Sequence, residues 1–440
     1  MRVDAEFFSK RHLRVAALLA KARKESIQQL THVSDGNHFA IADEFVDEGI
    51  PYYRGGDVVG HFFVEQCAPY FISPRAYHKE HMTRSHLIRG DVLLSIIGTI
   101  GESSLVISDD PATCSCKLAI LRPQKISPEY LAVFLRSEIG RSQTARFTRG
   151  ALQTGLLLED MDQLFIARFS DKFEKGVAEL VKIARHQFAE AKRFAGEAEA
   201  AFTATLLRDW HPPEPLTYTQ RASAALAAGR LDAEYFAPRV RELLDRLGAS
   251  GHAVRDVAPP RHEKFVPARE GEFDYIEISD VQSDGTTCRT RLPQREAPSR
   301  ATQFVRAGDV LTSTVRPIRR LSALIFPEQA GSVCSSGFVV LEPRAIEPEV
   351  LLTYLRLPLV CELMDLHTSA SLYPAISETD LLKLPFPSIP AKAAKKIVAA
   401  VRSAHTARQR AHDLLSTSQR AVEIAIEDNE AAALAFLERP

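Results

Sequence analysis

The chain carries the same sequence unit twice. Residues 2–8 (RVDAEFF) return as residues 230–236 (RLDAEYF), and residues 87–95 (LIRGDVLLS) return as residues 305–313 (VRAGDVLTS). Residues 114–131 match residues 334–351 at an offset of 220 positions. A period this long excludes a solenoid of many short repeats. The sequence therefore predicts two copies of one unit of about 220 residues, which suits a target that is itself in two parts.

Composition narrows the class of protein. The chain has 440 residues, 45% hydrophobic and 25% charged, which is ordinary for a globular protein with several domains. Its net charge is −1, so any affinity for nucleic acid must come from local patches. Its six cysteines include no paired C-x-x-C clusters, which predicts reduced thiols. With no signal-like apolar core and no membrane-length apolar run, we expect a cytoplasmic protein without membrane contact.

Each copy begins with a mixed α/β region and ends in a long helix. Short β-like runs at residues 92–97, 118–121, 310–313 and 338–341 are bounded by Gly, Pro and Asp turn signals. Helical periodicity follows each region. The predicted boundaries are a first domain at 1–172, a helix at 173–208, a linker at 209–229, a second domain at 230–390 and a second helix at 391–440.

The two predicted helices share one coiled-coil register. Apolar residues of the first helix recur in alternating steps of four and three, and the second helix repeats them at the offset of 220. Arg408 interrupts the second seam. Such seams predict two helices that pack closely on each other. The residues expected to pack there are Val177, Val181, Phe188, Phe202, Ile397, Val401, Leu415 and Val422.

Several motifs recur in one order in both copies. The first is R-x-D-A-E-[FY]-F, and the second is G-D-V-L at 90–93 and 308–311. The third is the segment 97–101 in the first copy, which corresponds to 314–317 in the second. The last is the pair of loops 148–153 and 368–373. In this order they resemble the DNA-specificity subunit of type I restriction-modification systems, a phage-defence complex. The resemblance covers nearly the whole chain. It implies an α/β (α+β) fold in which two tandem target-recognition domains are arranged with approximate two-fold symmetry about two long antiparallel helices.

The same resemblance implies a function and partners. Each domain is expected to read one half of a split, asymmetric sequence in double-stranded DNA. The helices are expected to act as a spacer and to dock two methyltransferase (modification) subunits. S-adenosylmethionine and ATP are expected on those subunits and on a restriction/translocase subunit, so this chain is expected to hold no cofactor and to be no enzyme.

Arginine is concentrated in the second copy. Residues 285–320 hold eight arginines against two acids, and residues 75–86 form a weaker basic counterpart in the first copy. Guanidinium groups can bind both phosphates and the edges of guanine bases. The alternative is that the arginine-rich segments are only solvated surface loops. The residues expected to contact DNA are Arg54, Lys79, Arg84, Arg149, Gln153, Arg289, Arg291, Arg316, Arg319, Arg320, Ser369, Ser371 and Tyr373.

Equivalent loop positions carry different side chains in the two copies. Gln153 of the first loop matches Tyr373 of the second. Glutamine can pair with adenine through two bonds, whereas tyrosine offers a hydroxyl and a ring. The two halves should therefore read different sequences. The alternative is that both side chains only order their loops.

Other candidate sites have weaker support. Asp4 and Glu6 suggest acid/base chemistry, but acids before an aromatic pair are more typical of a helix start. His78 and His81 lack the further ligands that a closed zinc site needs. The chain contains no G-x-G turn, no P-loop and no methyltransferase-like Asp/Asn-Pro-Pro-aromatic motif. Two alternatives stay open: a diverged DNA-acting enzyme (nuclease or methyltransferase) and a protein-binding scaffold of a defence complex.

Overall fold

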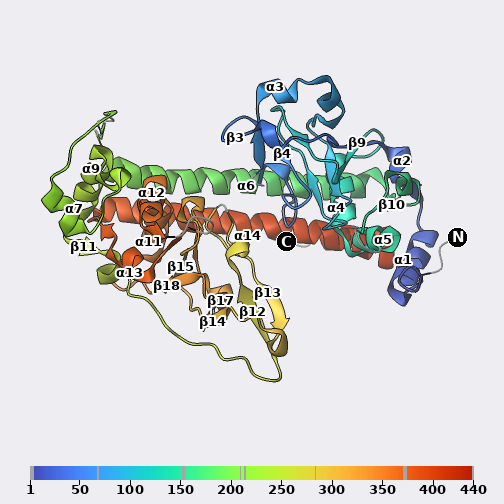
Figure 1. Cartoon of the computed structure of the whole chain (residues 1–440). Coiled ribbons are helices and arrows are strands. Elements are labelled where there is room, and N and C mark those ends of the chain that lie inside the picture. The colour runs from blue at the N-terminus through green and yellow to red at the C-terminus, as the bar shows by residue number, and fades with distance from the viewer. Residues whose placement is uncertain are drawn as a thin grey trace. The chain divides into compact units, whose positions relative to one another are not determined.

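The duplication in the sequence is present in the fold. The computed structural model (Figure 1) describes residues 4–66, 69–150, 154–208, 210–212, 215–282, 284–369 and 374–438. Its contacts define two compact units. Unit 1 consists of Met1–Phe188 and Arg408–Pro440, and unit 2 of Ala189–Ala407.

Both units contain a similar succession of elements. In unit 1 they are α1 (Lys10–Lys21), β1 (Lys24–Ser26), α2 (Ile27–Leu30), β2 (Thr31–Asp35), β3 (Phe45–Val46), β4 (Ile50–Tyr53), β5 (Tyr70–Ile72), α3 (Pro74–Tyr77), β6 (Val92–Ser95), β7 (Ser103–Leu105), β8 (Thr113–Cys114), β9 (Leu118–Pro123), α4 (Pro128–Arg136), α5 (Glu138–Phe147), β10 (Phe165–Ala167) and α15 (Glu430–Leu437).

The elements of unit 2 follow a related order, with both additions and omissions. They are α7 (Ala222–Ala228), α8 (Ala233–Phe236), α9 (Pro238–Gly248), β11 (His252–Ala253), α10 (Val254–Val257), β12 (Glu272–Ile276), β13 (Thr290–Pro293), β14 (Ala301–Phe304), β15 (Val310–Ser313), β16 (Ser322–Leu324), β17 (Val333–Ser335), β18 (Phe338–Leu341), α11 (Pro348–Arg356), α12 (Pro358–Leu366), β19 (Thr368–Ser369), β20 (Ala375–Ile376), α13 (Glu378–Lys383) and β21 (Pro385–Phe386).

Corresponding sheets share their central pairing and differ at their edges, since β2 has no paired strand as its counterpart among the described residues of unit 2, and β3 pairs with β5 whereas β14 pairs with β17. In unit 1 the orders are β2-β9-β6-β7 and β3-β5-β4-β8, and in unit 2 they are β16-β15-β18 and β13-β12-β17-β14. Both units pair one strand in parallel within a largely antiparallel sheet, β4 with β8 and β12 with β17. The register also matches, since Val92 faces Leu121 and Val310 faces Leu341.

The central sheet of each unit has helices on one face and the second sheet on the other. In β6, Val92 and Leu94 belong to the core shared with the helices, while Leu93 belongs to the core between the sheets. In β15, Val310 and Leu311 divide in the same way. This alternation follows from the two-residue period of a strand. Because both faces are covered, every residue of β6 and β15 is buried, including the polar residues at their ends.

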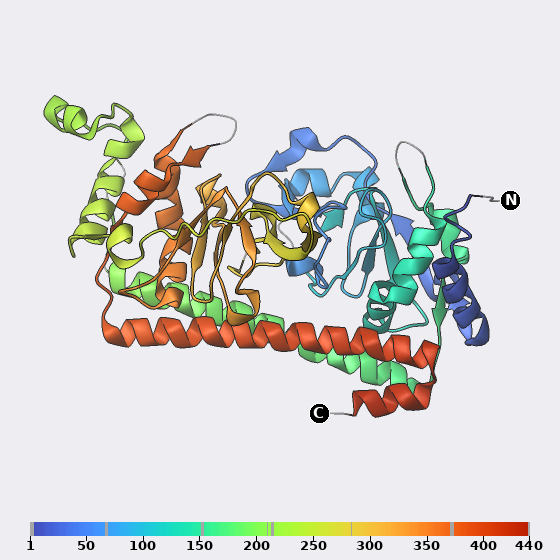
Figure 2. The same cartoon turned by 90° about the horizontal axis from the view of Figure 1, so that it is seen from below.

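Two long helices, α6 (Asp171–Leu206) and α14 (Ala391–Glu427), pass through both units. Each is about 54 Å long at 1.5 Å per residue. In unit 1 the first half of α6 shares a core with the second half of α14, and in unit 2 the second half of α6 shares a core with the first half of α14. The helices are therefore antiparallel, and within each unit they lie side by side (Figures 1 and 2). This confirms the predicted fold class of mixed α/β domains with two long helices.

The seam residues of these helices are mostly buried. Val177, Val181 and Phe202 are at most 1% exposed, as are Ile397 and Val422. Leu415 is 5% exposed, and Phe188 and Val401 are half-buried. Phe188 packs edge-on against Phe63 and His412. Arg408 is also buried, at 8% exposure, so the seam of α14 contains a charged group.

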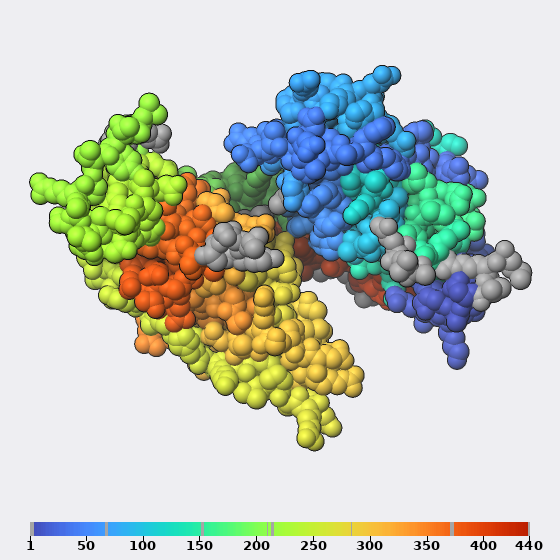
Figure 3. All heavy atoms as spheres, in the orientation of Figure 1, coloured from blue at the N-terminus to red at the C-terminus, as the bar shows by residue number. Residues whose placement is uncertain are grey.

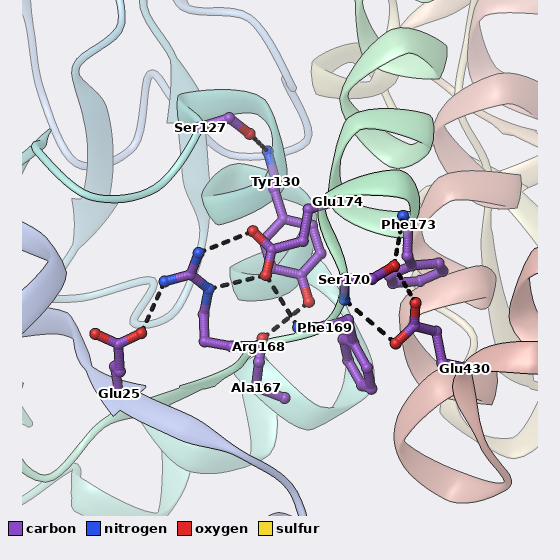
Figure 4. A network of polar contacts seen from close by, with 10 residues as sticks. All are labelled: Glu25, Ser127, Tyr130, Ala167, Arg168, Phe169, Ser170, Phe173, Glu174 and Glu430. Carbon is purple, nitrogen blue, oxygen red and sulfur yellow. Dashed lines mark hydrogen bonds and ion pairs between the residues drawn. The ribbon is translucent and has the colours of Figure 1, made fainter.

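A polar network joins α6 to the globular part of unit 1 (Figure 4). Arg168 bonds Glu174 in the first turn of α6 at 2.8 Å and Glu25 in β1 at 2.9 Å. The buried Tyr130 hydroxyl donates to the Ala167 carbonyl at 2.9 Å. The backbone N–H of Ser170 donates to Glu430 of α15 at 3.2 Å. These bonds fix the start of α6 on the β1–β10 pair and on the carboxyl-terminal helix.

The segment between the two copies contains a helix that buries no side chain. This helix is α7, in which Leu226 is 78% exposed, and Leu216 and Leu231 on either side are also exposed. The green segment that contains α7 stands at the surface in Figure 3. None of the helices in the described ranges is long and apolar enough to cross a membrane.

Candidate nucleic-acid interface

Each unit brings a turn and a loop together beside its central sheet, and we call them the turn–loop pair. In unit 2 the turn is residues 314–321, between β15 and β16, and the loop is residues 368–376. Val315 and Ala375 form an isolated β-bridge. The backbone N–H of Arg316 donates to Pro374 O at 2.8 Å, and that of Ile376 donates to Thr314 O at 3.0 Å. The two segments are therefore held at a fixed distance.

Unit 1 builds the same pair from its own residues. The turn is residues 96–102, between β6 and β7, and the loop is residues 148–156. Ile97 and Gly155 form the equivalent bridge, and the backbone N–H of Leu156 donates to Ile96 O at 2.8 Å. The loop also closes on itself through a second bridge between Arg149 and Gly155. The fold thus places Arg149 in unit 1 and Ser369 in unit 2 beside corresponding turns.

The turn of unit 2 carries three arginines with different surroundings. Arg320 donates to Arg356 O at 2.6 Å and forms an ion pair with Glu199 of α6. Arg319 is exposed, and no ion pair to it exists within the described part of the chain. Ile318 is 53% exposed, although it is a large apolar residue. The turn therefore presents a cation and an apolar side chain to solvent.

A buried arginine holds each turn from inside. Arg356 of α11 donates to Arg320 O at 2.6 Å and to Ser322 O at 3.1 Å. Burial lowers the pKa of Arg356 to about 10, so the group stays charged at neutral pH. Arg136 occupies the matching place in α4 and donates to Ser103 O at 2.7 Å. Burial also lowers the pKa of Arg136.

Arg54 borders the turn of unit 1. It makes two bonds with Asp57, at 3.0 and 3.1 Å, and its guanidinium lies 3.8 Å from the centre of the Tyr70 ring. Hydrogen bonding to Asp57 raises the pKa of Arg54. The neighbouring Gly55 carbonyl accepts a bond from Thr99 in the turn, at 3.4 Å. Arg54 is 43% exposed along its side chain, so one of its faces reaches solvent.

Sequence reasoning missed Lys117 beside this turn. Its Cβ lies 3.3 Å from the position that a Cβ would occupy at Gly55, and its side chain is exposed. Unit 2 has Gly337 at the matching position, 220 residues later. The signal in the sequence was that the first copy has a lysine where the otherwise matching segment of the second copy has a glycine.

Lys79 and Arg84 lie in a different part of unit 1. Lys79 forms an ion pair with Glu44 at 2.5 Å, which holds the pKa of Glu44 below its usual value. Arg84 lies in the 3-10 helix Glu80–Ser85 and pairs with Asp35 at the end of β2. Arg149 likewise pairs with an acid, the buried Asp160. Contact with DNA would have to compete with these pairs.

The arginine cluster of unit 2 is largely neutralised by acids from elsewhere. Arg291, on β13, pairs with Glu272 at 3.0 Å and with Asp274 at 3.4 Å, both on β12. Arg289 lies 3.6 Å from Asp274. Arg306 pairs with Glu263 in the same manner, at 2.8 Å. The eight arginines are thus distributed over several elements: three lie at or next to β13, two lie on either side of β14, and three lie in the turn.

Three predicted contact residues, Gln153, Ser371 and Tyr373, lie outside the described residues. Ser369 faces Ala375 in the β19–β20 hairpin, next to the turn of unit 2.

Potential metal ligands and thiols are two kinds of reactive group in the described part of the chain. No group of three or more His, Cys, Asp or Glu residues there could hold a metal ion. Burial raises the pKa of Cys334 to about 12 and that of Cys361 to about 11, so both thiols stay protonated at neutral pH. Burial raises the pKa of Cys114 further still. A protonated, buried thiol packs as a small apolar group and is a poor nucleophile.

Comparison with known proteins gives similarity in structure only. No family model and no curated protein matches the chain. Three solved structures that align with nearly the whole chain belong to type I restriction-modification systems. The S subunit from M. genitalium has 12% identity and a TM-score of 0.37, and the alignment covers 95% of this chain and 96% of that one.

The other two structures align over a similar length. The HsdS subunit from Thermoanaerobacter tengcongensis has 16% identity and a TM-score of 0.29, with coverage of 92% of this chain and 97% of that one. A chain from a structure on complex assembly and conformational transition of the type I R-M system has 18% identity and a TM-score of 0.29. Its alignment covers 94% and 96% of the two chains.

Proposed function

We propose that this chain is a non-catalytic DNA-specificity subunit of a type I restriction-modification complex. Each unit reads one half of a bipartite, asymmetric target through its turn–loop pair. The long helices space the two units and dock two methyltransferase subunits. Those subunits and a restriction/translocase subunit carry out the chemistry that uses S-adenosylmethionine and ATP. This chain determines which DNA sequence the complex binds.

One observation carries the proposal: the fold is duplicated around turn–loop pairs that are bridged in the same way but carry different side chains. Lys117 and Arg54 border the turn in unit 1, whereas Arg316 and Arg319 lie within the turn in unit 2. A duplicated catalytic site would require the same reactive groups in both copies. Two readers of different half-sites require the same frame with different contact residues, and the different side chains at the two turns support this proposal.

Selection from a random library of double-stranded DNA tests the proposal. The full-length chain should enrich a motif with two defined blocks separated by bases of no preference. Binding should weaken with salt, with a log–log slope of about −0.9 for each phosphate contact. Enrichment of a single uninterrupted block, or of no motif, would contradict the proposal.

The two alternatives predict different results with the same protein. A diverged nuclease or methyltransferase would cleave or methylate DNA without partners when supplied with Mg²⁺ or S-adenosylmethionine. A protein-binding scaffold would not bind DNA, so reversing the charges of Arg316 and Arg319 to glutamate would change nothing. Under our proposal the double variant loses preference in one block of the motif and keeps preference in the other.

A further inference from the structure

The R-x-D-A-E-[FY]-F segment that opens each copy is not part of either turn–loop pair. In unit 2 it covers residues 230–236 and includes α8. Arg230 makes two bonds with Asp232, at 2.8 and 2.6 Å, so the charge of this arginine is balanced within the segment. Its guanidinium also lies 4.5 Å from the centre of the Tyr235 ring. The segment therefore fixes the direction of one arginine from two sides.

This arginine contacts the two residues that precede the loop 368–376, and we call these two residues the loop root. Arg230 donates to Leu366 O at 2.6 Å, and its Nη1 lies 3.4 Å from Nδ1 of His367. The next residue, Thr368, is the first of the β19–β20 hairpin. The opening segment of unit 2 thus holds the chain at the point where the loop begins.

Unit 1 joins the same two places with an arginine from the other side. Phe7 of its opening segment occupies the position of Tyr235, and it packs edge-on against Phe147 with ring centres 5.6 Å apart. The preceding residue, Arg146, donates to Phe7 O at 3.1 Å, and its guanidinium lies 4.2 Å from the centre of the Phe7 ring. Arg146 occupies the position of Leu366, 220 residues earlier.

The junction in each unit therefore contains an arginine, an aromatic ring and a backbone carbonyl. In unit 2 the arginine belongs to the opening segment and bonds the loop root, whereas in unit 1 it precedes the loop and bonds the opening segment. Arg2, the counterpart of Arg230, lies outside the described residues. The side chain of Arg230 is 24% exposed, so its bonds are partly shielded from water. Bonds from a charged donor are stronger than those between neutral groups.

We infer that Arg230 is a positioning residue that orders the DNA-binding loop of unit 2 before DNA binds. The inference rests on the proposed function, because only that function makes the loop a DNA contact. The turn holds the far end of the loop, since the backbone N–H of Ile376 donates to Thr314 O at 3.0 Å. Arg230 provides the corresponding hold at the near end. A loop that is ordered in advance loses less conformational entropy on binding.

Hydrogen exchange and DNA dissociation, measured on the full-length chain, test the inference. Arg230→Ala removes the arginine from the junction. Leu366→Arg, added to this variant, restores an arginine at the position that Arg146 has in unit 1. Arg241→Ala is the matched control. The guanidinium of Arg241 lies 5.9 Å from the centre of the Tyr235 ring, but within the described residues it bonds no atom of the loop root.

Arg230→Ala should speed the exchange of the Ile376 amide by about tenfold, as expected when one residue of backbone loses its fixed conformation. The amides of β15 should exchange as in the wild type, because the pairing of this strand with β16 and β18 does not involve the loop root. Dissociation from the DNA motif that the wild-type chain enriches should become faster by a similar factor, with little change in the association rate. The double variant should recover both slower rates, and Arg241→Ala should change neither.

The two measurements separate the possible failures. Unchanged exchange at Ile376 in Arg230→Ala would refute the positioning role. Faster exchange that extends equally to β15 would also refute it, because Arg230 would then be a general support of the fold. Faster exchange without faster dissociation would overturn the link between loop order and DNA binding. A wild-type chain that enriches no split motif would refute the proposed function itself, and exchange at Ile376 would then decide alone whether Arg230 orders the loop.

Discussion

The two units share a frame and differ where the frame meets solvent. In both, a buried arginine from a helix holds the strand that follows the turn, Arg136 in unit 1 and Arg356 in unit 2. In both, a bridge ties the turn to the polar loop. At the ends of the turn, however, left-handed glycines in unit 1 become left-handed arginines in unit 2.

The comparison separates two kinds of constraint on the same fold. Side chains that hold the frame face inward and keep their chemistry between copies. Side chains at the ends of the turn are free to change as long as the left-handed backbone is maintained.

The buried arginines should be the most sensitive positions of the frame. Arg136→Met and Arg356→Met each remove the side-chain donor of one buried strand carbonyl, Ser103 O in unit 1 and Ser322 O in unit 2. The second carbonyl that each arginine bonds, His61 O or Arg320 O, keeps another donor. Each change should cost about 3 kcal/mol of unfolding free energy, measured by hydrogen exchange of the adjacent strands.

The matched control for the buried arginines is Arg141→Met. Arg141 pairs with Glu102 at 3.5 Å, but its side chain is 47% exposed. Its loss should cost less than about 1 kcal/mol. A similar cost for Arg141 and Arg136 would mean that burial of the bonded carbonyls does not determine stability here.

Substitution of glycine by alanine should lower the unfolding free energy by different amounts at the two ends of the unit 1 turn. Gly98→Ala meets only the left-handed backbone strain and should cost about 1 kcal/mol. Gly101→Ala adds a clash, because the new Cβ would stand 2.5 Å from Thr144 Oγ1. It should cost about 2 to 3 kcal/mol by urea unfolding. Equal losses of unfolding free energy in the two variants would show that the Thr144 side chain moves away freely. Adding Thr144→Ala to Gly101→Ala would then restore no stability.

Much of the frame could be predicted from the sequence because the copies match one another. The strands around Val92 and Val310, and the seams of the long helices, follow from patterns with periods of two and three to four residues. The left-handed residues were visible only in unit 1, where Gly98 stands. Nothing in the local sequence of Arg316 indicates a positive φ, since only the surrounding bonds impose it.

The charge of the site could not be predicted from the sequence. A window on residues 285–320 shows eight arginines and two acids, but most of the acids that pair with these arginines lie outside the window, on β12, on α6 and at Glu263. Glu199 is 121 residues away from Arg320 in the sequence. Counting charges along the chain therefore overstated the basic surface at the β13 edge. It missed the positive charge beside the turn of unit 1, because Lys117 lies outside any basic run of the sequence.

The paired arginines of the β13 edge allow a test of whether they contact DNA at all. Asp274 lies between Arg289 and Arg291. Asp274→Asn releases both guanidinium groups, so if they reach phosphates the affinity should rise up to about fivefold, and the salt slope should steepen by about 0.9 for each new contact.

The control for this change removes an acid from another part of unit 2. Glu242 of α9 pairs with Arg246 at 3.2 Å, and Glu242→Gln should leave DNA affinity unchanged within twofold, roughly the effect of one distant exposed charge. If Asp274→Asn behaves like Glu242→Gln in a titration at two salt concentrations, the β13 edge is not part of the interface.

The smallest predicted effect concerns the residue that precedes each polar loop. In unit 1 Phe147 packs edge-on against Phe7, with ring centres 5.6 Å apart, and in unit 2 His367 packs edge-on against Tyr235 at 5.8 Å. Burial, and then the charge of Arg230, lower the pKa of His367. Asp232, Asp380 and Lys383 also act on this histidine, and the two aspartates oppose the shift.

Unit 2 should therefore lose stability in acid through a group that unit 1 lacks. An unfolded histidine takes up its proton near pH 6.5, whereas folded His367 resists protonation until a lower pH. The contribution is complete above pH 6.5 and is lost as the pH falls through the lowered value. His367→Phe copies unit 1 and should reduce the drop in the thermal midpoint between pH 7.5 and pH 5.5. His252→Gln, at an exposed position on β11, should keep the full drop. An unchanged drop in His367→Phe would show that the two junctions are equivalent despite their different rings.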